Sequence, residues 1–100
     1  MKKKVKQPDF LLLDKIQALA ALLRTGNQHA WASHLLRAIQ RSQSDAQLRR
    51  DMLQFYEGMG SLNEIVLYVD GIPEWKINQD FAVLRADVLA RCEGHVAATC

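Results

Sequence analysis

The segment from Gly58 to Gly71, which reads GMGSLNEIVLYVDG, constrains the fold more than any other part of this chain. Its first glycines favour the end of a helix, because glycine readily adopts the left-handed backbone that terminates helices. The β-branched and aromatic run Ile65–Val69 is too short for a helix and is typical of a strand. Asp70-Gly71 then predicts a two-residue hairpin turn, and Pro73 confines the returning strand to an edge. Two strands alone are marginal in water, so we expect this hairpin or extended segment to lie on helices.

Helical periodicity governs the rest of the chain. Apolar residues recur at helical spacing in four stretches, which predicts helices over residues 10–25, about 28–41, about 45–57 and about 79–91. The expected N-caps are Asp9, Ser44 and Asn78, and the expected terminating glycines are Gly26, Gly58 and Gly94. The fold class is therefore predicted to be all-α or mostly α: a compact four-helix domain with a short β-hairpin or extended segment between the third and fourth helices. Short connections favour antiparallel neighbours.

The 100 residues are enough for one domain. We expect a flexible basic arm over residues 1–8, a single helical domain over 9–94 and a frayed tail over 95–100. Residues 1–56 carry ten Lys or Arg and four Asp or Glu, a charge of +6, whereas residues 57–100 carry three and seven, a charge of −4. The arm contributes Lys2, Lys3, Lys4 and Lys6, and without them the net charge of the rest is −2. Such a body argues against nucleic-acid binding, which needs a basic surface.

The sequence does not predict export or membrane insertion. The basic start is followed by Pro8 and Asp9 instead of the uncharged apolar region of a signal peptide. No apolar stretch approaches the roughly 20 residues that span a bilayer. Cys92 and Cys100 are too few for a disulfide framework, and free thiols are typical of cytosolic proteins. We expect a cytoplasmic protein, with a Cys92–Cys100 bridge as the open alternative.

The spacing of polar residues argues against catalysis, metal binding and phosphate binding. Phosphate-binding loops place glycines between a strand and a helix, whereas Gly58 and Gly60 follow a helix and precede an extended run. The two histidines of the second helix are five residues apart and do not share a helical face. Cys92 and His95 supply two ligands where a zinc site needs at least three. No nucleophile, base and orienting carboxylate fall together, so we expect no enzyme, no metal and no cofactor.

Two groups of residues remain as candidates. The first is a basic face predicted to point outward from the second and third helices: His34, Arg37, Arg41, Arg49 and Arg50. A solvated polar face is the ordinary interpretation of this pattern, and the functional alternative is a surface that binds an acidic protein. The second group is a turn: Gly58, Gly60, Ser61, Asn63 and Glu64. Its Ser and Glu have capping-box spacing, and we expect the turn to serve backbone geometry rather than chemistry.

The same turn carries a resemblance. The motif runs Gly58-Met59-Gly60-Ser61-Leu62-Asn63-Glu64-Ile65-Val66-Leu67. It is similar to the turn, of the type GMGSxN[DE]xVL, in a family of small, uncharacterised bacterial helical proteins. Phe81–Arg85 looks like the final helix of that family, and Trp31 with Leu35 looks like its second. The resemblance covers most of residues 10–92 and implies a bacterial, cytoplasmic, mostly helical domain; it implies no activity.

These observations predict a small protein-binding module, of which an immunity protein or inhibitor that masks a toxin or enzyme is one form. The expected partner is a protein with an acidic surface. The opposite charges of the two halves also predict a homodimer. The alternative function is a nucleic-acid or anionic-surface binder that uses the N-terminal lysine arm, although the charge of the body makes nucleic acid the less favoured ligand.

Overall fold

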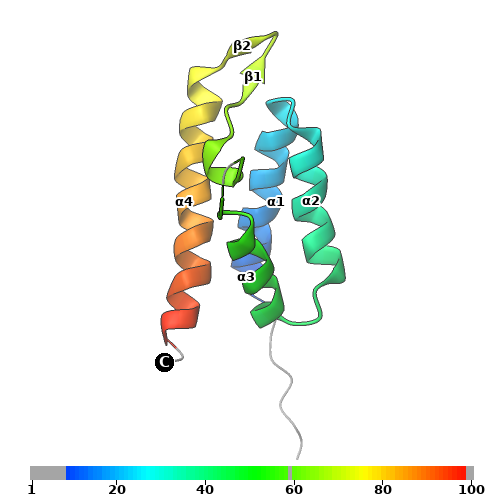
Figure 1. The fold of residues 1–100 in the computed structure, drawn as a ribbon, viewed down its shortest axis with the longest axis vertical. Coiled ribbons are helices and arrows are strands. Elements are labelled where there is room, and N and C mark those ends of the chain that lie inside the picture. Colours follow the sequence, from blue (N-terminus) through cyan, green and yellow to red (C-terminus); the bar gives the residue numbers. More distant parts are fainter. Residues whose placement is uncertain (1–8, 59, 99–100) are drawn as a thin grey trace, which may run out of the picture.

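The computed structural model describes residues 9–58 and 60–98, the last five of these as backbone only. It confirms the predicted fold class: four helices with a small antiparallel hairpin between the third and the fourth (Figure 1). The elements are α1 (Phe10–Thr25), α2 (His29–Arg41), α3 (Asp45–Gln54), the single 3₁₀ turn η1 (Leu62–Glu64), β1 (Tyr68–Val69), β2 (Ile72–Pro73) and α4 (Trp75–Ala98). The predicted arm, residues 1–8, and Cys100 lie outside the described residues.

The caps of the first and third helices are those that the sequence predicts. Asp9 caps α1, because one carboxylate oxygen accepts the N–H of Leu12 at 3.1 Å. Ser44 caps α3 in the same way through the N–H of Gln47, also at 3.1 Å. Gly26 follows the last turn of α1, as expected. These local signals therefore fix where the helices begin and end.

α3 ends earlier than predicted, at Gln54 instead of near Glu57. The N–H groups of Phe55, Tyr56 and Glu57 reach back only three residues, to carbonyl oxygens at 3.0, 3.1 and 3.3 Å. This tighter winding leads the chain into Gly58, whose φ is +84°. The chain thus leaves the α-helix one turn before its glycine.

α1 contributes more buried apolar residues than any other helix. It packs against α2 and α4, while α3 packs against α4 and α2. The core joins buried residues from every helix and from the segment before the hairpin: Leu12, Ile16, Leu19, Ala20, Leu23, Ala32, Leu35, Ala38, Leu48, Met52, Tyr56, Leu62, Leu67, Phe81, Val88 and Cys92. The helical stripes read from the sequence are therefore the core.

α4 is longer than the sequence predicts. It begins at Trp75, four residues before the expected start, and continues past Gly94 to Ala98. Glu74 provides the cap that was assigned to Asn78, because its side chain accepts the N–H of Ile77 at 2.9 Å. Asn78 therefore lies inside the helix, where its side chain is free for another role.

The hairpin has the geometry that its turn dictates. β1 and β2 pair antiparallel, with Tyr68 opposite Pro73 and Val69 opposite Ile72. The two turn residues both have positive φ, +55° at the aspartate and +78° at the glycine, as a type I′ turn requires. The predicted strand over Ile65–Val69 is thus confined to its last two residues.

Candidate functional site

The outward side of α2 presents the cationic residues that the sequence singles out there. His34, Arg37 and Arg41 are all exposed, and the opposite side of α2 is buried in the core. α2 contains no acidic residue. Within residues 9–58 and 60–98, neither Arg37 nor Arg41 forms an ion pair. This part of the surface, which we call the α2 basic face, carries two guanidinium charges that nothing in the described chain neutralises.

The two arginines of α3 differ in their exposure to solvent. Arg50 is exposed, as predicted, but the prediction that Arg49 joins the face is wrong. Arg49 is only 4% exposed, and its Nη2 donates to a carboxylate oxygen of Asp9 at 2.9 Å. It lies next to the buried Leu48 on the helix, on the side that faces the start of α1. Its counter-ion is 40 residues away in the sequence, so no local pattern indicates its burial.

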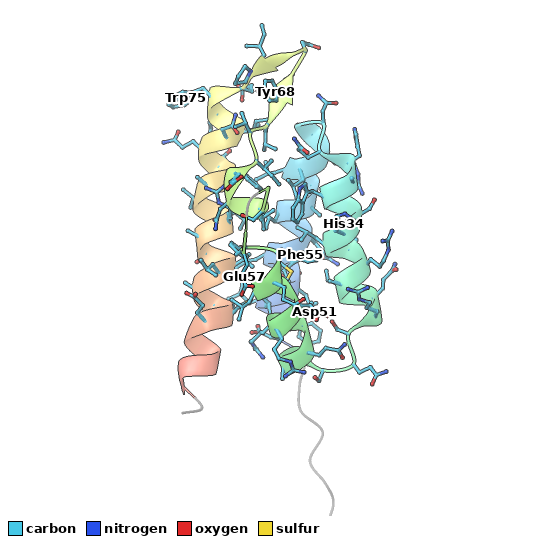
Figure 2. All side chains as sticks on the ribbon, viewed as in Figure 1. His34, Asp51, Phe55, Glu57, Tyr68 and Trp75 are labelled. Atoms are coloured by element: carbon cyan, nitrogen blue, oxygen red, sulfur yellow. The ribbon has the colours of Figure 1, made fainter. Side chains whose placement is uncertain are left out.

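Aromatic rings border the α2 basic face. Trp31 is half-buried, and its ring meets those of His34 and Phe55 edge-on, with centroids 5.8 Å and 5.6 Å apart. Figure 2 shows that the imidazole comes from α2 and the phenyl ring from the end of α3. Edge-to-face contacts of this kind are favourable and hold rings in place. The basic face therefore has a defined aromatic edge.

The turn after α3 has the geometry expected of it. Gly60 has a φ of +71°, and Gly58 is also in the left-handed region. Ser61 accepts the N–H of Asn63 at 3.2 Å and so caps η1. A carboxylate oxygen of Glu64 accepts the N–H of Gly60 at 2.7 Å, one residue before the position it would reach in a standard capping box. The turn thus closes on itself.

Asn63 and Arg85 fasten this turn to the helices on either side. The side-chain amide of Asn63 donates to the carbonyl of Tyr56 at 3.1 Å. A guanidinium N–H of Arg85 donates to the carbonyl of Leu62 at 3.3 Å. Both bonds satisfy backbone oxygens that lie outside regular structure. The polar residues of the turn are therefore engaged in holding its backbone.

The extended stretch before the hairpin is held on one side by α4. The N–H of Leu67 donates to Oδ1 of Asn78 at 2.8 Å, and Nδ2 of Asn78 donates back to the carbonyl of Leu67 at 2.9 Å. The amide side chain thus imitates a neighbouring strand, which explains why no regular strand forms here. Asn78 is predicted to be a cap, and no local pattern indicates its role here, because its partner lies 11 residues earlier in another segment.

The same stretch is held on its other side by the connection between α1 and α2. The N–H of Tyr68 donates to the carbonyl of Gly26 at 3.2 Å, and the Asn27 side chain donates to the carbonyl of Tyr68 at 2.8 Å. A Cβ placed on Gly26 would lie 2.5 Å from the Cβ of Leu67. Glycine is therefore required at position 26 for close approach. It is not required for ending the helix, because the φ of Gly26 is −90° and the left-handed residue after α1 is Asn27, with a φ of +68°.

A charge cluster joins the start of α1 to α3 and α4. Asp9 accepts from Arg49 and from Nε of Arg91, the latter at 3.3 Å, and its backbone N–H donates to Asp45 at 2.9 Å. Partial burial alone would raise the pKa of Asp9, but the N–H of Leu12 and the guanidinium groups of Arg91 and Arg49 outweigh it and lower that pKa below its ordinary value. The cluster therefore keeps this carboxylate ionised.

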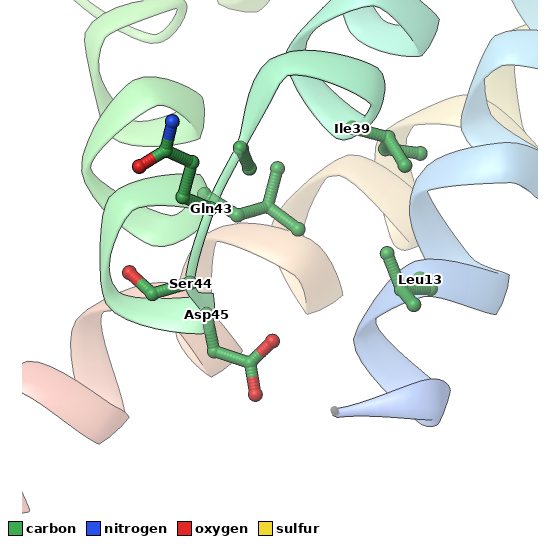
Figure 3. A pocket seen from close by; sticks show the side chains of 7 residues that line it. Leu13, Ile39, Gln43, Ser44 and Asp45 are labelled. Carbon is green, nitrogen blue, oxygen red and sulfur yellow. The ribbon is translucent and has the colours of Figure 1, made fainter. Parts of the chain in front are cut away.

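A pocket of about 480 Å³ lies between α1 and the turn from α2 to α3 (Figure 3). Its lining residues are Leu13, Ile39, Ser42, Gln43, Ser44, Asp45 and Leu48. Ser44 and Asp45 are engaged by backbone N–H groups, and Ser42 donates to the carbonyl of Ala38 at 2.6 Å. Of these lining residues, only the aspartate has an acidic or basic side chain. The pocket thus has an apolar floor, and the polar groups at its rim are engaged in hydrogen bonds at helix ends. Its lining does not bring together an acid and a base as an active site would.

Other chemical features are few in the described residues. They include no group of three or more His, Cys, Asp or Glu that could hold a metal ion, and no helix among them is long and apolar enough to cross a membrane. Burial raises the pKa of the Cys92 thiol to about 11. A buried thiol with such a pKa is a poor nucleophile at neutral pH.

Fold and surface together define a small helical domain with one uncompensated basic helix face and no assembled set of reactive groups in the described part. The chain belongs to the family described as a domain of unknown function (DUF6966), whose sequence model matches residues 24–73. The match runs from the end of α1 through α2, α3 and the turn to the end of β2. A search of curated proteins and a search of solved structures each gave no significant match. Membership of an uncharacterised domain family is thereby shown, whereas the GMGSxN[DE]xVL-type turn as the signature of that family and a bacterial origin stay predictions.

Proposed function

We propose that this protein is a small protein-binding module that uses the α2 basic face to bind an acidic surface of another protein. The observation that carries the proposal is that exposed cations gather on a helix without a carboxylate. Lys15, Lys76, Arg49 and Arg91 each pair with a carboxylate of the same chain. Arg37 and Arg41 form no such pair within the described residues, and the helix that bears them has no acidic residue. Arg24 and Arg50 likewise form no ion pair within the described residues, but the helices that bear them carry aspartates.

The chemistry of the face suits a protein partner. Arginine and tryptophan are enriched among the residues that contribute most to protein interfaces, and both occur here, as Arg37, Arg41 and the half-buried Trp31. Charge complementarity accelerates association and selects the orientation of binding. The chain without its first eight residues has a net charge of −2, which supports a protein partner over nucleic acid.

Masking is the mode of action we propose, as in an immunity protein or inhibitor that covers a toxin or enzyme in a bacterial cytoplasm. A rigid helical face bound to an acidic site would block access to that site by contact alone. The main support is that the α2 basic face is assembled and the pocket between α1 and α3 has no free reactive groups. The genes that neighbour this one offer an independent check, since a toxin or effector gene is expected beside an immunity gene.

The proposal is tested by affinity capture followed by reconstitution. Partners captured from the native cell are identified, purified and titrated against the wild-type chain and the double variant Arg37→Glu/Arg41→Glu. We expect the variant to weaken binding at least about 10-fold and to abolish its salt dependence, because two favourable charges become unfavourable. Arg24→Glu is the matched control: Arg24 is exposed on α1 and should leave affinity unchanged. Equal affinity of the double variant and the wild type would refute the α2 basic face as the binding site.

Removing the N-terminal arm distinguishes the alternative function, an anionic-surface binder, from the protein-binding module. A chain that lacks residues 1–7 keeps the entire α2 basic face and loses Lys2, Lys3, Lys4 and Lys6. Salt-dependent binding to DNA or to anionic vesicles that disappears with this truncation would favour the anionic-surface binder and count against the protein-binding module. We expect the truncated chain to retain its protein partner.

A further inference from the structure

α4 exposes an uncharged stripe along the side that faces away from the other helices. The exposed positions are Trp75, Gln79, Val83, Ala86 and Ala90, which are spaced four, four, three and four residues apart. Trp75 is 72% exposed and Val83 is 67% exposed. The opposite side of the helix carries Phe81, Val88 and Cys92 into the core. Figure 2 shows the Trp75 side chain directed away from the rest of the molecule.

A helix of this kind ordinarily turns charged residues to solvent. The α2 basic face follows that rule, whereas the α4 stripe does not. Trp75 lies at one end of the stripe and Val83 in its middle, and two alanines lie toward the other end. Between residues 75 and 90, α4 therefore has an apolar side in the core and an uncharged side opposite to it, which is the pattern of a helix with a second packing partner.

We propose that the stripe is the interface of a two-fold dimer, in which α4 packs antiparallel against α4 of a second copy. In a two-fold interface, residue i of one copy meets residue j of the other, and j meets i. An antiparallel pair centred between residues 82 and 83 sets Trp75 against Ala90 of the second copy. It also sets Gln79 against Ala86 and places the two Val83 side chains beside the axis. Each large ring then meets a methyl group, and the alanines allow the helices to approach closely.

The charges beside the stripe fit the antiparallel arrangement. Lys76, Asp80 and Asp87 share one flank of α4, and in an antiparallel helix pair like flanks face each other. Lys76 of one copy then lies at the level of Asp87 of the other. In a parallel pair unlike flanks face each other, so Lys76 and Asp87 would not meet across the contact. Such a pair would also set Trp75 level with Trp75 and leave alanine level with alanine at the far end. Charge and size therefore both select the antiparallel pair.

Pairs within each copy leave this flank close to neutral. Lys76 bonds Asp80 at 3.0 Å, four residues on, and Asp87 pairs with Lys15 of α1. No block of like charge opposes the approach of a second copy. The stripe from residue 75 to 90 is about 22 Å long at the rise of an α-helix, so the contact is small and we expect a dissociation constant nearer micromolar than nanomolar.

The dimer goes beyond the proposed function. α2 packs against α1 and α3 and does not contribute to the stripe. Each dimer would consequently display two α2 basic faces, which raises the avidity for a partner with repeated acidic sites. This arrangement also differs from pairing between the oppositely charged halves of the chain, because its central contacts are apolar.

Sedimentation equilibrium of the full chain tests the dimer. We expect the mass to approach twice the 11.3 kDa of one chain as concentration rises, at low and at high salt alike. Val83→Glu and Ala86→Glu should each weaken the dimer at least about 10-fold, because they bury a charge in the contact. Both positions are exposed, so the thermal midpoint at low concentration should not change. Ala21→Glu is the matched control, since Ala21 is exposed on α1; it should leave the dimer intact.

The outcomes separate this proposal from its alternatives. A wild-type chain that stays monomeric at millimolar concentration refutes it, and so does a dimer that survives Val83→Glu. A dimer that dissociates in high salt or with Arg37→Glu/Arg41→Glu indicates pairing through the charged halves instead. If no partner is captured but the chain still dimerises, the result counts against the proposed function of the α2 basic face and leaves the α4 dimer standing. The two proposals can therefore be refuted independently.

Cross-linking tests the direction of the pair. In a Cys100→Ser background, the remaining Cys92 is buried, so an introduced cysteine is the reactive thiol under mild oxidation. Val83→Cys should form a disulfide-linked dimer readily, because position 83 lies beside the two-fold axis. Trp75→Cys should cross-link poorly, because the two copies of position 75 lie at opposite ends. Efficient cross-linking at position 75 would show a parallel pair and overturn the proposed geometry.

Discussion

Replacing Asp9 by asparagine should separate the charge of this residue from its role as a helix cap. Asparagine caps helices about as well as aspartate, so the bond to the N–H of Leu12 can persist. The negative charge is lost, and with it the counter-ion of Arg49. The Arg49 side chain is only 5% exposed, its Nη2 is the atom that donates to Asp9, and its Nε has no hydrogen-bond partner among the described residues. The variant therefore strands a buried guanidinium.

The expected cost follows from that burial. Removing one partner of a buried ion pair costs about 3–5 kcal/mol. Asp9 itself is 16% exposed, so water partly replaces the lost carboxylate, and we expect Asp9→Asn to lower the free energy of unfolding by about 2–3 kcal/mol. Asp9→Ala should cost about 1 kcal/mol more through loss of the cap. Urea unfolding at pH 7 measures both differences.

The pH dependence gives the same experiment a second readout. The pKa of Asp9 is lower in the folded state than its ordinary value of 3.8. Its charge therefore stabilises the fold at pH values above 3.8, and this stabilisation is lost as the pH falls through the folded-state pKa. The difference between wild type and Asp9→Asn should shrink below about pH 4. Asp14→Asn is the control: this exposed residue of α1 should change stability by less than about 0.5 kcal/mol. An Asp9→Asn variant as stable as wild type at pH 7 would refute the reasoning.

Three further predictions concern backbone and thiol. Asn78→Ala should lower the free energy of unfolding by about 1–3 kcal/mol, because it strands the N–H of Leu67, whereas the Leu67 carbonyl keeps the N–H of Glu74 at 3.1 Å. Chemical denaturation measures this, and a loss below about 0.5 kcal/mol would contradict the strand-like pairing. Gly26→Ala should lower the free energy of unfolding by about 1–3 kcal/mol, because the added Cβ would clash with Leu67. Gly60 has open space around it, so Gly60→Ala should lower that free energy by only about 1 kcal/mol, through its positive φ. Equal losses in the two variants would argue against the close approach at Gly26. In a Cys100→Ser chain, Cys92 should react with a thiol reagent at pH 8 only after unfolding, because the thiol is buried and burial raises its pKa to about 11. Fast labelling of the folded chain would contradict this prediction.

The helices were predictable because their signals are local. The stripe of α1 repeats every three or four residues, and Asp9 and Ser44 lie directly before the helices that they cap. The hairpin turn was predictable for the same reason, since Asp70-Gly71 is enough to select a type I′ turn. Pattern and cap lie within a few residues of each other in each case, and no distant contact overrides them.

The rest depends on contacts between residues far apart in the chain. Arg49 is buried because Asp9 meets it from 40 residues away, which a helical wheel of α3 cannot reveal. Asn78 looks like a cap in sequence, but its place inside α4 follows from Glu74 capping the helix earlier. The exposed Trp75 precedes residue 79, where the sequence predicts the start of the last helix, so the pattern does not assign it to that helix. The α4 stripe is not predicted for the same reason, since its first member lies outside the predicted helix.

The two-sided attachment of the stretch around Leu67 has a consequence for how the domain opens. This stretch docks only when the connection at Gly26 and the first turns of α4 are both in place, so we expect docking to come late in folding. Its release should also precede the separation of α4 from α1. The N–H of Leu67 bonds a side chain instead of a helix carbonyl, so its native-state hydrogen exchange should report this sub-global opening separately from the fraying of any helix.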